Sequence, residues 1–329
     1  MSFRISPLWW PVLAVASPVL VPGLLLRNRR FQRECVRVAE RNRERMDGAE
    51  PLEMPEVDFL ELTVLVEWEA REGFLGDPGV SYLFKTDLGS MLFDIGFGAT
   101  RPAFTHNTAK LGFTLDQVEA LTISHLHHDH MGGMSAMRSR QVTVPEGWMP
   151  SERMPCFLPD TAEADGFQAQ QVTKPQLLAA GMASTGPLAR SFFLLGTIEE
   201  QAVLVRVKDK GLVVFTGCGH PTIEVILEMA GRLSNEPLYA IGGGLHFPVT
   251  GARDRRAGLQ LPAIAGTGKP PWRRITDEDL SRTINALNAA APKKVYLSAH
   301  DTCDHALERM KRELEAETEV LEAGASYHL

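Results

Sequence analysis

The chain has 329 residues, of which 44% are hydrophobic and 23% charged, a composition that can bury a sizeable core. Its 34 basic and 41 acidic residues give a formal net charge of −7, so we expect no nucleic-acid partner. The four cysteines lie far apart without a CxxC pair, which argues against a disulfide framework and against a structural zinc ribbon. A reducing compartment fits this pattern best.

The N-terminal segment joins an uncharged apolar run to a basic one. Residues 5–26 carry no charge, and about 20 apolar residues are enough to cross a bilayer as a helix. Eight arginines follow between Arg27 and Arg45, whereas Arg4 alone precedes the run. This bias predicts that the downstream domain is cytoplasmic. We expect residues 1–26 to be a membrane-associated segment and residues 27–56 an Arg-rich helical linker on the cytoplasmic membrane face.

Four prolines between residues 7 and 22 leave the geometry of the apolar run open. In lipid, the carbonyl groups that prolines free from a helix need other partners. The run therefore either spans the bilayer as a kinked helix, lies in the membrane interface, or packs on the protein as a hydrophobic arm.

The remainder, residues 57–329, is predicted to be one domain of strands punctuated by helices. Apolar β-branched or aromatic runs bounded by turn residues predict strands at residues 60–68, 79–86, 90–97, 120–124, 141–145, 201–207, 211–217, 237–243 and 293–299. Helical patterns occur at residues 222–233, 277–289 and 303–315, with a helical turn at 115–120. No internal repeat is present, so a layered α/β domain is favoured.

A dense histidine cluster follows the predicted strand at 120–124. Residues 124–133 read SHLHHDHMGG. Imidazole and carboxylate groups suit zinc, iron or manganese. His125 and His127 can point the same way from a turn to hold one ion, and Asp129 and His130 can serve a neighbouring one. His128, between them, is not expected to be a ligand.

This cluster resembles the H-x-H-x-D-H metal motif of the metallo-β-lactamase fold superfamily. The resemblance implies an α/β fold, an αββα sandwich with two divalent metal ions at its edge, zinc being the first choice and iron or manganese the alternatives. It also implies that Asp94, in the preceding LFDIG, lies beneath the metal ligands and supports them; an ordinary turn aspartate is the alternative.

Downstream segments narrow the resemblance, which covers about residue 60 to the C-terminus. They are GCGH with Cys218 and His220, AIGGGLHF with His246, and AHDTCDHA with His300. These are similar to the GCSH, GGFHL and HCTGxxA segments of the dihydropterin ribofuranosylaminobenzene phosphate synthase-like branch. The altered letters, DTC for CTG and GCGH for GCSH, leave pterin or phosphosugar specificity open.

The resemblance also implies a role for each of these residues. One ion would be held by His125, His127 and His220, and the other by Asp129, His130 and His300. Cys218 stands where many relatives carry an aspartate that bridges two metals, so it is either a bridging ligand or a buried structural thiol. His246 is either a general acid or a further ligand.

Residues 248–274 are rich in Pro and Gly and carry six basic residues against one aspartate. Such a connection is longer than usual, which favours a substrate lid or a membrane-facing loop. We expect Arg253, Arg255 and Arg256 to bind an anionic substrate or headgroup.

These observations predict a metal-dependent hydrolase tethered to the membrane. A metal-activated hydroxide would attack a phosphoester or an acyl substrate (an ester, lactone or thioester), either a small molecule or a lipid. Asp129 would orient the nucleophile, and His246 or the second metal would stabilise the leaving oxygen. The alternative is an iron-containing redox protein or a noncatalytic metal-binding membrane protein on the same fold. The oligomeric state stays open.

Overall fold

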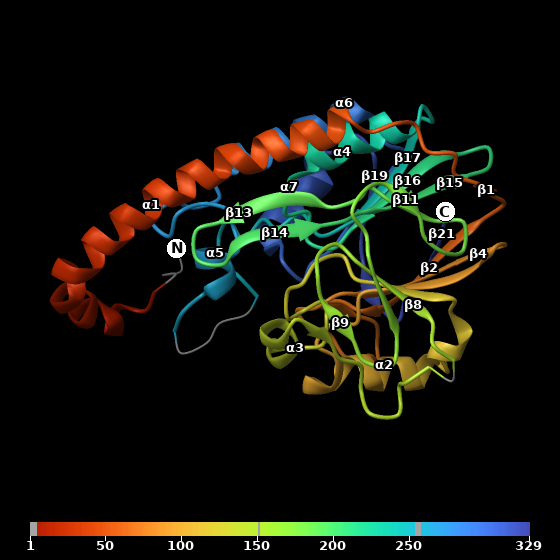
Figure 1. Ribbon diagram of the computed structural model, residues 1–329, viewed down its shortest axis with the longest axis horizontal. Coiled ribbons are helices and arrows are strands. Elements are labelled where there is room, and N and C mark those ends of the chain that lie inside the picture. The colour runs from red at the N-terminus through yellow and green to blue at the C-terminus, as the bar shows by residue number, and fades with distance from the viewer. Residues whose placement is uncertain (1–4, 151, 254–257) are drawn as a thin grey trace.

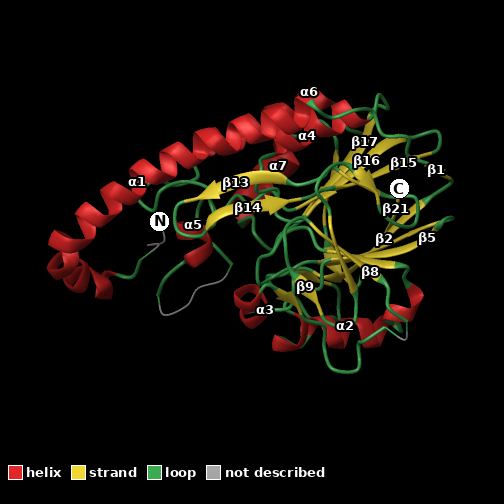
Figure 2. Cartoon of the chain, in the orientation of Figure 1, coloured by secondary structure: helices red, strands yellow, loops and turns green. Residues whose placement is uncertain are grey.

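Two β-sheets face each other and carry helices on their outer faces, while one long helix extends past the body of the molecule (Figure 1). This computed structural model describes residues 5–150, 152–253 and 258–329. The predicted αββα layering is confirmed (Figure 2).

The first sheet has seven strands in the order β10-β8-β6-β5-β4-β2-β21. Their bounds are β2 Leu60–Val66, β4 Ser81–Thr86, β5 Gly89–Phe93, β6 Ala120–Thr122, β8 Pro155–Leu158, β10 Gln168–Gln171 and β21 Ser326–His328. The strands from β5 to β10 in this order pair in parallel, and the others pair antiparallel. Helices α2 (Ala103–Leu111) and α3 (Met134–Ser139) lie on its outer side (Figure 1).

The second sheet has eight strands in the order β11-β12-β15-β16-β17-β18-β19, with β1 also paired to β15. Their bounds are β1 Glu56–Val57, β11 Gln176–Leu177, β12 Ala183–Ser184, β15 Val203–Val207, β16 Gly211–Thr216, β17 Leu238–Gly243, β18 Lys294–Leu297 and β19 Glu317–Val320. Strands β16 to β19 are parallel. Helices α4 (Ile223–Leu233), α6 (Asp277–Ala290) and α7 (Asp304–Glu313) cover its outer face (Figure 1).

Short elements complete the described chain. They are the 3-10 turns η1 Pro7–Trp9, η2 Gly98–Thr100 and η3 Leu115–Gln117, helix α5 Leu261–Ala265, and the paired strands β3 Glu69–Ala70 with β20 Glu322–Ala323, β7 Gln141–Val142 with β9 Glu163–Ala164, and β13 Leu188–Phe192 with β14 Gly196–Glu200. The β13–β14 pair is a hairpin beside the second sheet.

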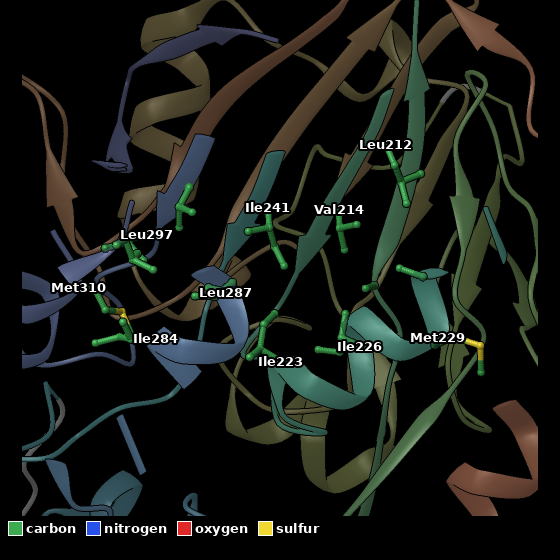
Figure 3. Packing of buried hydrophobic residues seen from close by; sticks show 14 of the residues in the cluster. Leu212, Val214, Ile223, Ile226, Met229, Ile241, Ile284, Leu287, Leu297 and Met310 are labelled. Atoms are coloured by element: carbon green, nitrogen blue, oxygen red, sulfur yellow. The ribbon is translucent and has the colours of Figure 1, made fainter. Parts of the chain in front are cut away.

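The hydrophobic core is built in three layers. Aromatic side chains from both sheets, among them Tyr82, Phe84 and Phe215, fill the space between the sheets. Figure 3 shows Val214 and Ile241 of the second sheet facing Ile226 of α4. Each fully buried side chain of this size contributes about 1.5–3 kcal/mol. All six residues of β16 are buried, as expected for a strand covered on both faces.

Most predicted elements are present at nearly the predicted bounds. The runs at 60–68, 79–86, 211–217, 237–243 and 293–299 contain β2, β4, β16, β17 and β18, and the three predicted helices are α4, α6 and α7. Helices α2 and α3, strands β8 and β10 and the β13–β14 hairpin were not predicted.

Helix α1 spans Trp10–Asp47 and unites the two N-terminal segments that the sequence separates. It continues through Pro18 and Pro22. Most side chains of its first half are exposed in the described structure: Val15 is 85% exposed and Val19 is 80% exposed. The structure therefore does not contain the third predicted arrangement, in which the apolar run packs on the protein as a hydrophobic arm. Among the described residues, this helix alone is long and apolar enough to cross a membrane, by length and composition only.

The second half of α1 is docked on the β13–β14 hairpin. The Asn42 side-chain amide donates to the Ala189 carbonyl (2.9 Å) and accepts from the Ala189 N–H (2.8 Å). Glu199 accepts hydrogen bonds from Arg41 and Arg45. Phe31 packs edge-on against Phe193, with 5.5 Å between ring centroids. This half of the helix is thus an integral part of the domain.

We predict that the two halves of α1 differ in their effect on stability. Deleting residues 1–26 removes no buried side chain of the described part of the chain and should leave the free energy of unfolding unchanged. Deleting residues 1–49 removes the buried Phe31, Val38, Asn42 and Met46 and should lower it by at least about 4 kcal/mol. Urea unfolding of both truncated chains and the full chain in one detergent checks this. Equal stability of the two truncated chains would contradict the docking.

Candidate metal centre

The predicted site residues meet at one edge of the sandwich, where several strands end. The histidine cluster follows β6, Cys218 and His220 follow β16, His246 follows β17, and His300 follows β18. Because parallel strands place their carboxyl ends at the same edge, residues distant in sequence come together there.

His125, His127 and His220 form the first group of side chains. His127 Nδ1 lies 2.9 Å from His125 Nε2 and 3.1 Å from His220 Nε2. Burial lowers the pKa of all three imidazoles, that of His127 to about 3, so their lone pairs are free to bind a cation. Three converging neutral nitrogens fit a zinc-like ion well.

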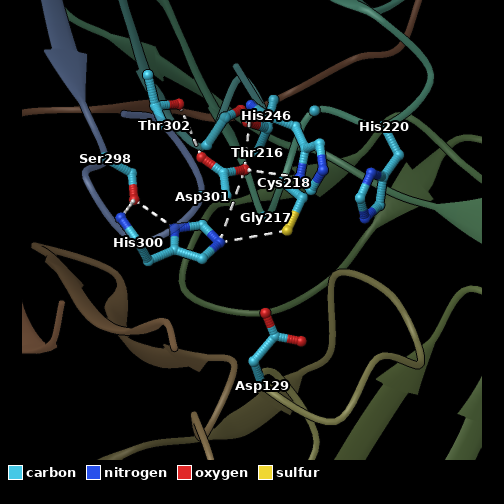
Figure 4. Close-up of polar contacts among 12 residues, drawn as sticks. Asp129, Thr216, Gly217, Cys218, His220, His246, Ser298, His300, Asp301 and Thr302 are labelled. Atoms are coloured by element: carbon cyan, nitrogen blue, oxygen red, sulfur yellow. Dashed lines mark hydrogen bonds and ion pairs between the residues drawn. The ribbon is translucent and has the colours of Figure 1, made fainter. Parts of the chain in front are cut away.

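Asp129, His130, Cys218 and His300 form the second group. Figure 4 shows three of them, Asp129, Cys218 and His300. Cys218 Sγ lies 3.1 Å from His130 Nε2 and 3.2 Å from His300 Nε2. Asp129 Oδ1 is buried and accepts no hydrogen bond from the described residues. A carboxylate, two imidazoles and a thiol are a reasonable donor set for a divalent ion.

Cys218 also lies within ligand distance of His220 and His246, so it belongs to both sides of the centre. Burial raises the pKa of its thiol well above the usual value. This position fits both alternatives for Cys218, a bridging ligand and a buried structural thiol.

Buried acids hold two of the imidazoles from behind. Asp94 Oδ2 lies 2.7 Å from His130 Nδ1. Although burial opposes protonation, Asp94 raises the pKa of His130 to about 9. Ser298 Oγ lies 2.5 Å from His300 Nδ1 and donates to Glu67. In both histidines the contact fixes Nδ1 and leaves Nε2 facing Cys218, as in metal sites whose ligands are oriented by outer partners.

Glu200, which the sequence analysis did not single out, holds the turn that carries Cys218 and His220. Its Oε1 accepts the N–H groups of Gly217 (3.2 Å), Cys218 (3.1 Å) and Gly219 (2.8 Å), and its Oε2 accepts that of His220 (2.8 Å). The carboxylate is 1% exposed, and burial raises its pKa to about 7. Four consecutive donors on one buried carboxylate define the backbone path through the centre.

His246 is partly buried beside the first group. Its ring centroid lies 5.0 Å from that of His220, its Nδ1 lies 3.5 Å from Asp301 Oδ2, and its Nε2 has no hydrogen-bond partner among the described residues. Its backbone N–H donates to Asp301 Oδ2 (3.1 Å). A Cβ on Gly266 would lie 2.9 Å from His246 Nε2, so the loop after α5 closes directly over this ring.

Of the three predicted substrate-binding arginines, Arg253 lies among the described residues. Arg253 donates to the Ala299 carbonyl (2.9 Å), pairs with Asp304 (2.7 Å) and lies over the Trp68 ring. It reaches the wall of a small cavity that Asp129 and His300 also line. Arg255 and Arg256 lie outside the described residues.

We predict that Glu200→Ala destabilises the protein and lowers its metal content. Four buried N–H groups would lose their acceptor, at a cost of about 1–3 kcal/mol for each group left unpaired, so we expect at least about 4 kcal/mol in total. Glu199→Ala, one residue away, is the matched control and should cost about 1 kcal/mol or less, because it removes partly exposed ion pairs. Urea unfolding and metal analysis measure both effects. Equal losses in the two variants would refute the role of Glu200.

Comparison with known proteins agrees with this architecture. Residues 75–232 match the model of the metallo-beta-lactamase superfamily. The 7,8-dihydropterin-6-methyl-4-(beta-D-ribofuranosyl)-aminobenzene-5'-phosphate synthase of Methanocaldococcus jannaschii is 23% identical over 246 residues, 58% of this chain and 79% of that protein.

Two crystal structures are similar. Tm1679, described as a metal-dependent hydrolase of the beta-lactamase superfamily, gives a TM-score of 0.58 at 22% identity over 82% of this chain and 98% of that chain. The metallo-beta-lactamase fold protein YhfI from Bacillus subtilis gives 0.49 at 15% identity over 83% and 100%. The chain therefore has the metallo-β-lactamase fold, and its residues 75–232 match that superfamily.

Proposed function

We propose that the protein is a metal-dependent hydrolase with a centre for two divalent ions. The observation that carries this proposal is the convergence of two ligand groups on either side of Cys218. His125, His127 and His220 would hold one ion, and Asp129, His130 and His300 the other. Zinc is the first choice for these nitrogen, oxygen and sulfur donors, with iron or manganese as alternatives.

Divalent ions at this position would supply Lewis acidity, which makes water nucleophilic near neutral pH and neutralises charge at the reacting centre. Asp129 Oδ1 lies 3.4 Å from His128 Nδ1 and accepts no hydrogen bond from the described residues, so it is suited to accept one from the attacking water and orient it. His246, with Nδ1 3.5 Å from Asp301 Oδ2 and Nε2 without a hydrogen-bond partner among the described residues, is suited to deliver a proton to the leaving oxygen. The substrate class is a phosphoester or an acyl compound.

The alternatives are an iron redox protein and a noncatalytic metal-binding protein on the same fold. The position of His246 supports a hydrolase: its Nε2 has no hydrogen-bond partner among the described residues and its Nδ1 lies 3.5 Å from Asp301 Oδ2, an arrangement that orients the ring for proton transfer. The synthase name of the relative at 23% identity describes that protein's reaction and leaves the bond cleaved here to be identified.

We predict about two metal equivalents per chain, with loss of metal and of hydrolysis in His127→Ala and Asp129→Ala. His128→Ala is the matched control: His128 packs against Phe97 and belongs to neither ligand group, so metal content should be retained. Metal analysis of the full chain, with turnover of phosphodiesters, lactones and thioesters, measures both effects. Full metal content in His127→Ala and Asp129→Ala would exclude this centre; an iron chromophore that bleaches on reduction would favour the redox alternative.

We further propose that the first half of α1 associates with the cytoplasmic face of the membrane, either across the bilayer or in its interface. The supporting observation is a continuous stretch of exposed apolar side chains. Its large members are Leu8, Trp9, Trp10, Val12, Leu13, Val15, Val19, Leu20, Val21, Leu25 and Leu26. In water such a stretch is unfavourable, and lipid would cover it.

We expect the full chain to float with liposomes and the chain starting at residue 27 to stay in the soluble fraction. The truncated chain keeps the docked half of α1, so its metal content should equal that of the full chain. Flotation on neutral liposomes and on liposomes with anionic lipid separates insertion from binding by the remaining arginines. Recovery of the full chain in the soluble fraction without detergent would sink the membrane proposal.

A further inference from the structure

A cavity of about 300 Å³ adjoins the candidate metal centre. His220 and His246 form one wall, and Phe192 of the hairpin, 5.0 Å from the His220 ring, forms another. The loop at residues 266–269 lines a further side. This volume is at the lower end of the range for small-molecule sites, so it can take one substituent of a substrate whose reacting bond lies at the metals.

Arg190, on β13, presents a cation to this cavity that no carboxylate neutralises directly. No Asp or Glu in the described part of the chain lies within ion-pair distance of its guanidinium. A Cβ on Gly268 would lie 2.4 Å from Arg190 Nε, so the loop packs tightly over the group. Burial lowers the pKa of Arg190, which shows that the charged form pays a desolvation cost.

The other two cations of the cavity are already paired. Lys269 and Arg282 both bind Asp279, the residue that also caps α6 together with Thr276. Their charge is therefore largely compensated within the protein. Arg190 is the exception: it is partly buried and has no ion-pair partner among the described residues, as expected of a cation in an anion-binding site.

Two further groups offer hydrogen bonds to the same cavity. Thr267 is 7% exposed, and its Oγ1 has no hydrogen-bond partner among the described residues. The first turn of α4, from Ile223, also lines the cavity, and Thr222 before it provides no side-chain cap. The N–H groups of a helix's first turn have no partner within the helix, and they carry the positive end of its dipole.

We infer that this cavity is a subsite for a phosphate group of the substrate, distinct from the bond that is cleaved. Arg190 would bind two phosphate oxygens side by side, Thr267 would donate its hydroxyl hydrogen to a third, and the first turn of α4 would donate backbone N–H groups. The subsite rests on the proposed hydrolase for its role in substrate binding, but phosphate binding itself requires no turnover.

Glu224, in the first turn of α4, is the charge that opposes this assignment. It lines the cavity but is an exposed residue, so its carboxylate can turn toward water. It forms no ion pair with Arg190 in the described chain. The fixed charge in the interior of the cavity thus comes from Arg190.

The test is a calorimetric titration of inorganic phosphate into the metal-loaded full chain. Arg190→Gln should weaken phosphate binding at least about tenfold through loss of charge-assisted hydrogen bonds. Arg282→Gln, the same change on a paired cation of the same cavity, should stay within about twofold of the unmodified protein. His127→Ala, which disrupts the metal centre, should keep the binding that depends on Arg190. The His127→Ala variant therefore distinguishes an error in the proposed phosphate subsite from an error in the proposed hydrolase function.

The melting temperature distinguishes phosphate binding from a structural role. Because Arg190 has no ion-pair partner among the described residues, Arg190→Gln removes no ion pair and should melt close to the temperature of the unmodified protein. Unchanged phosphate affinity in Arg190→Gln, or an equal loss in Arg282→Gln, would overturn the inference. Competition by glycerol 3-phosphate and by dihexanoyl phosphatidic acid then tells a soluble phosphate compound from a lipid headgroup as the source of the phosphate.

Discussion

The candidate centre depends on one buried carboxylate, that of Glu200. Four consecutive N–H groups, from Gly217 to His220, point at its two oxygens, and this fixes where Cys218 and His220 stand. Without an acceptor at this position, the turn after β16 would leave four buried donors unpaired, which no local alternative satisfies. The spacing between the two ligand groups is therefore set by a side chain that ligates nothing itself.

Similar buried acids recur around the centre, and the hydrogen bonds of each offset the free-energy cost of burying its carboxylate. Glu67, Asp94 and Glu200 are each at most 1% exposed, and burial raises the pKa of all three. Each is held by several hydrogen bonds, and two of them act on a histidine through its Nδ1, directly from Asp94 and through Ser298 from Glu67. Negative charge behind the ligands also complements cations in front of them. These outer partners would therefore hold the ligands in orientation before a metal ion binds.

The sequence predicted the parts of the site that are marked by a local sequence pattern. Histidines at alternate positions after an apolar strand identify a metal site without knowledge of the fold, and the strands with β-branched runs were predicted nearly to the residue. Glu200 gave no such signal, because a Glu beside Glu199 near a strand end is typical of a solvent-facing position; its burial arises from pairing between the hairpin and the β16 turn. Arg190 was not predicted either, because its place beside the cavity depends on contacts between segments that are distant in the sequence. Helix α1 was divided at Leu26 because charge changes there, whereas backbone hydrogen bonding continues past Pro18 and Pro22.

The continuity of α1 changes how a membrane segment would relate to the site. A flexible linker would let the catalytic domain move freely beneath the bilayer. Here Asn42 binds the backbone of Ala189, and the next residue, Arg190, lines the cavity beside the centre. Phe192, on the same face of β13 as Arg190, touches His127 and His220. A single strand thus links the docked helix to the cavity wall, so an orientation imposed on α1 by lipid would be passed to the cavity as a rigid body.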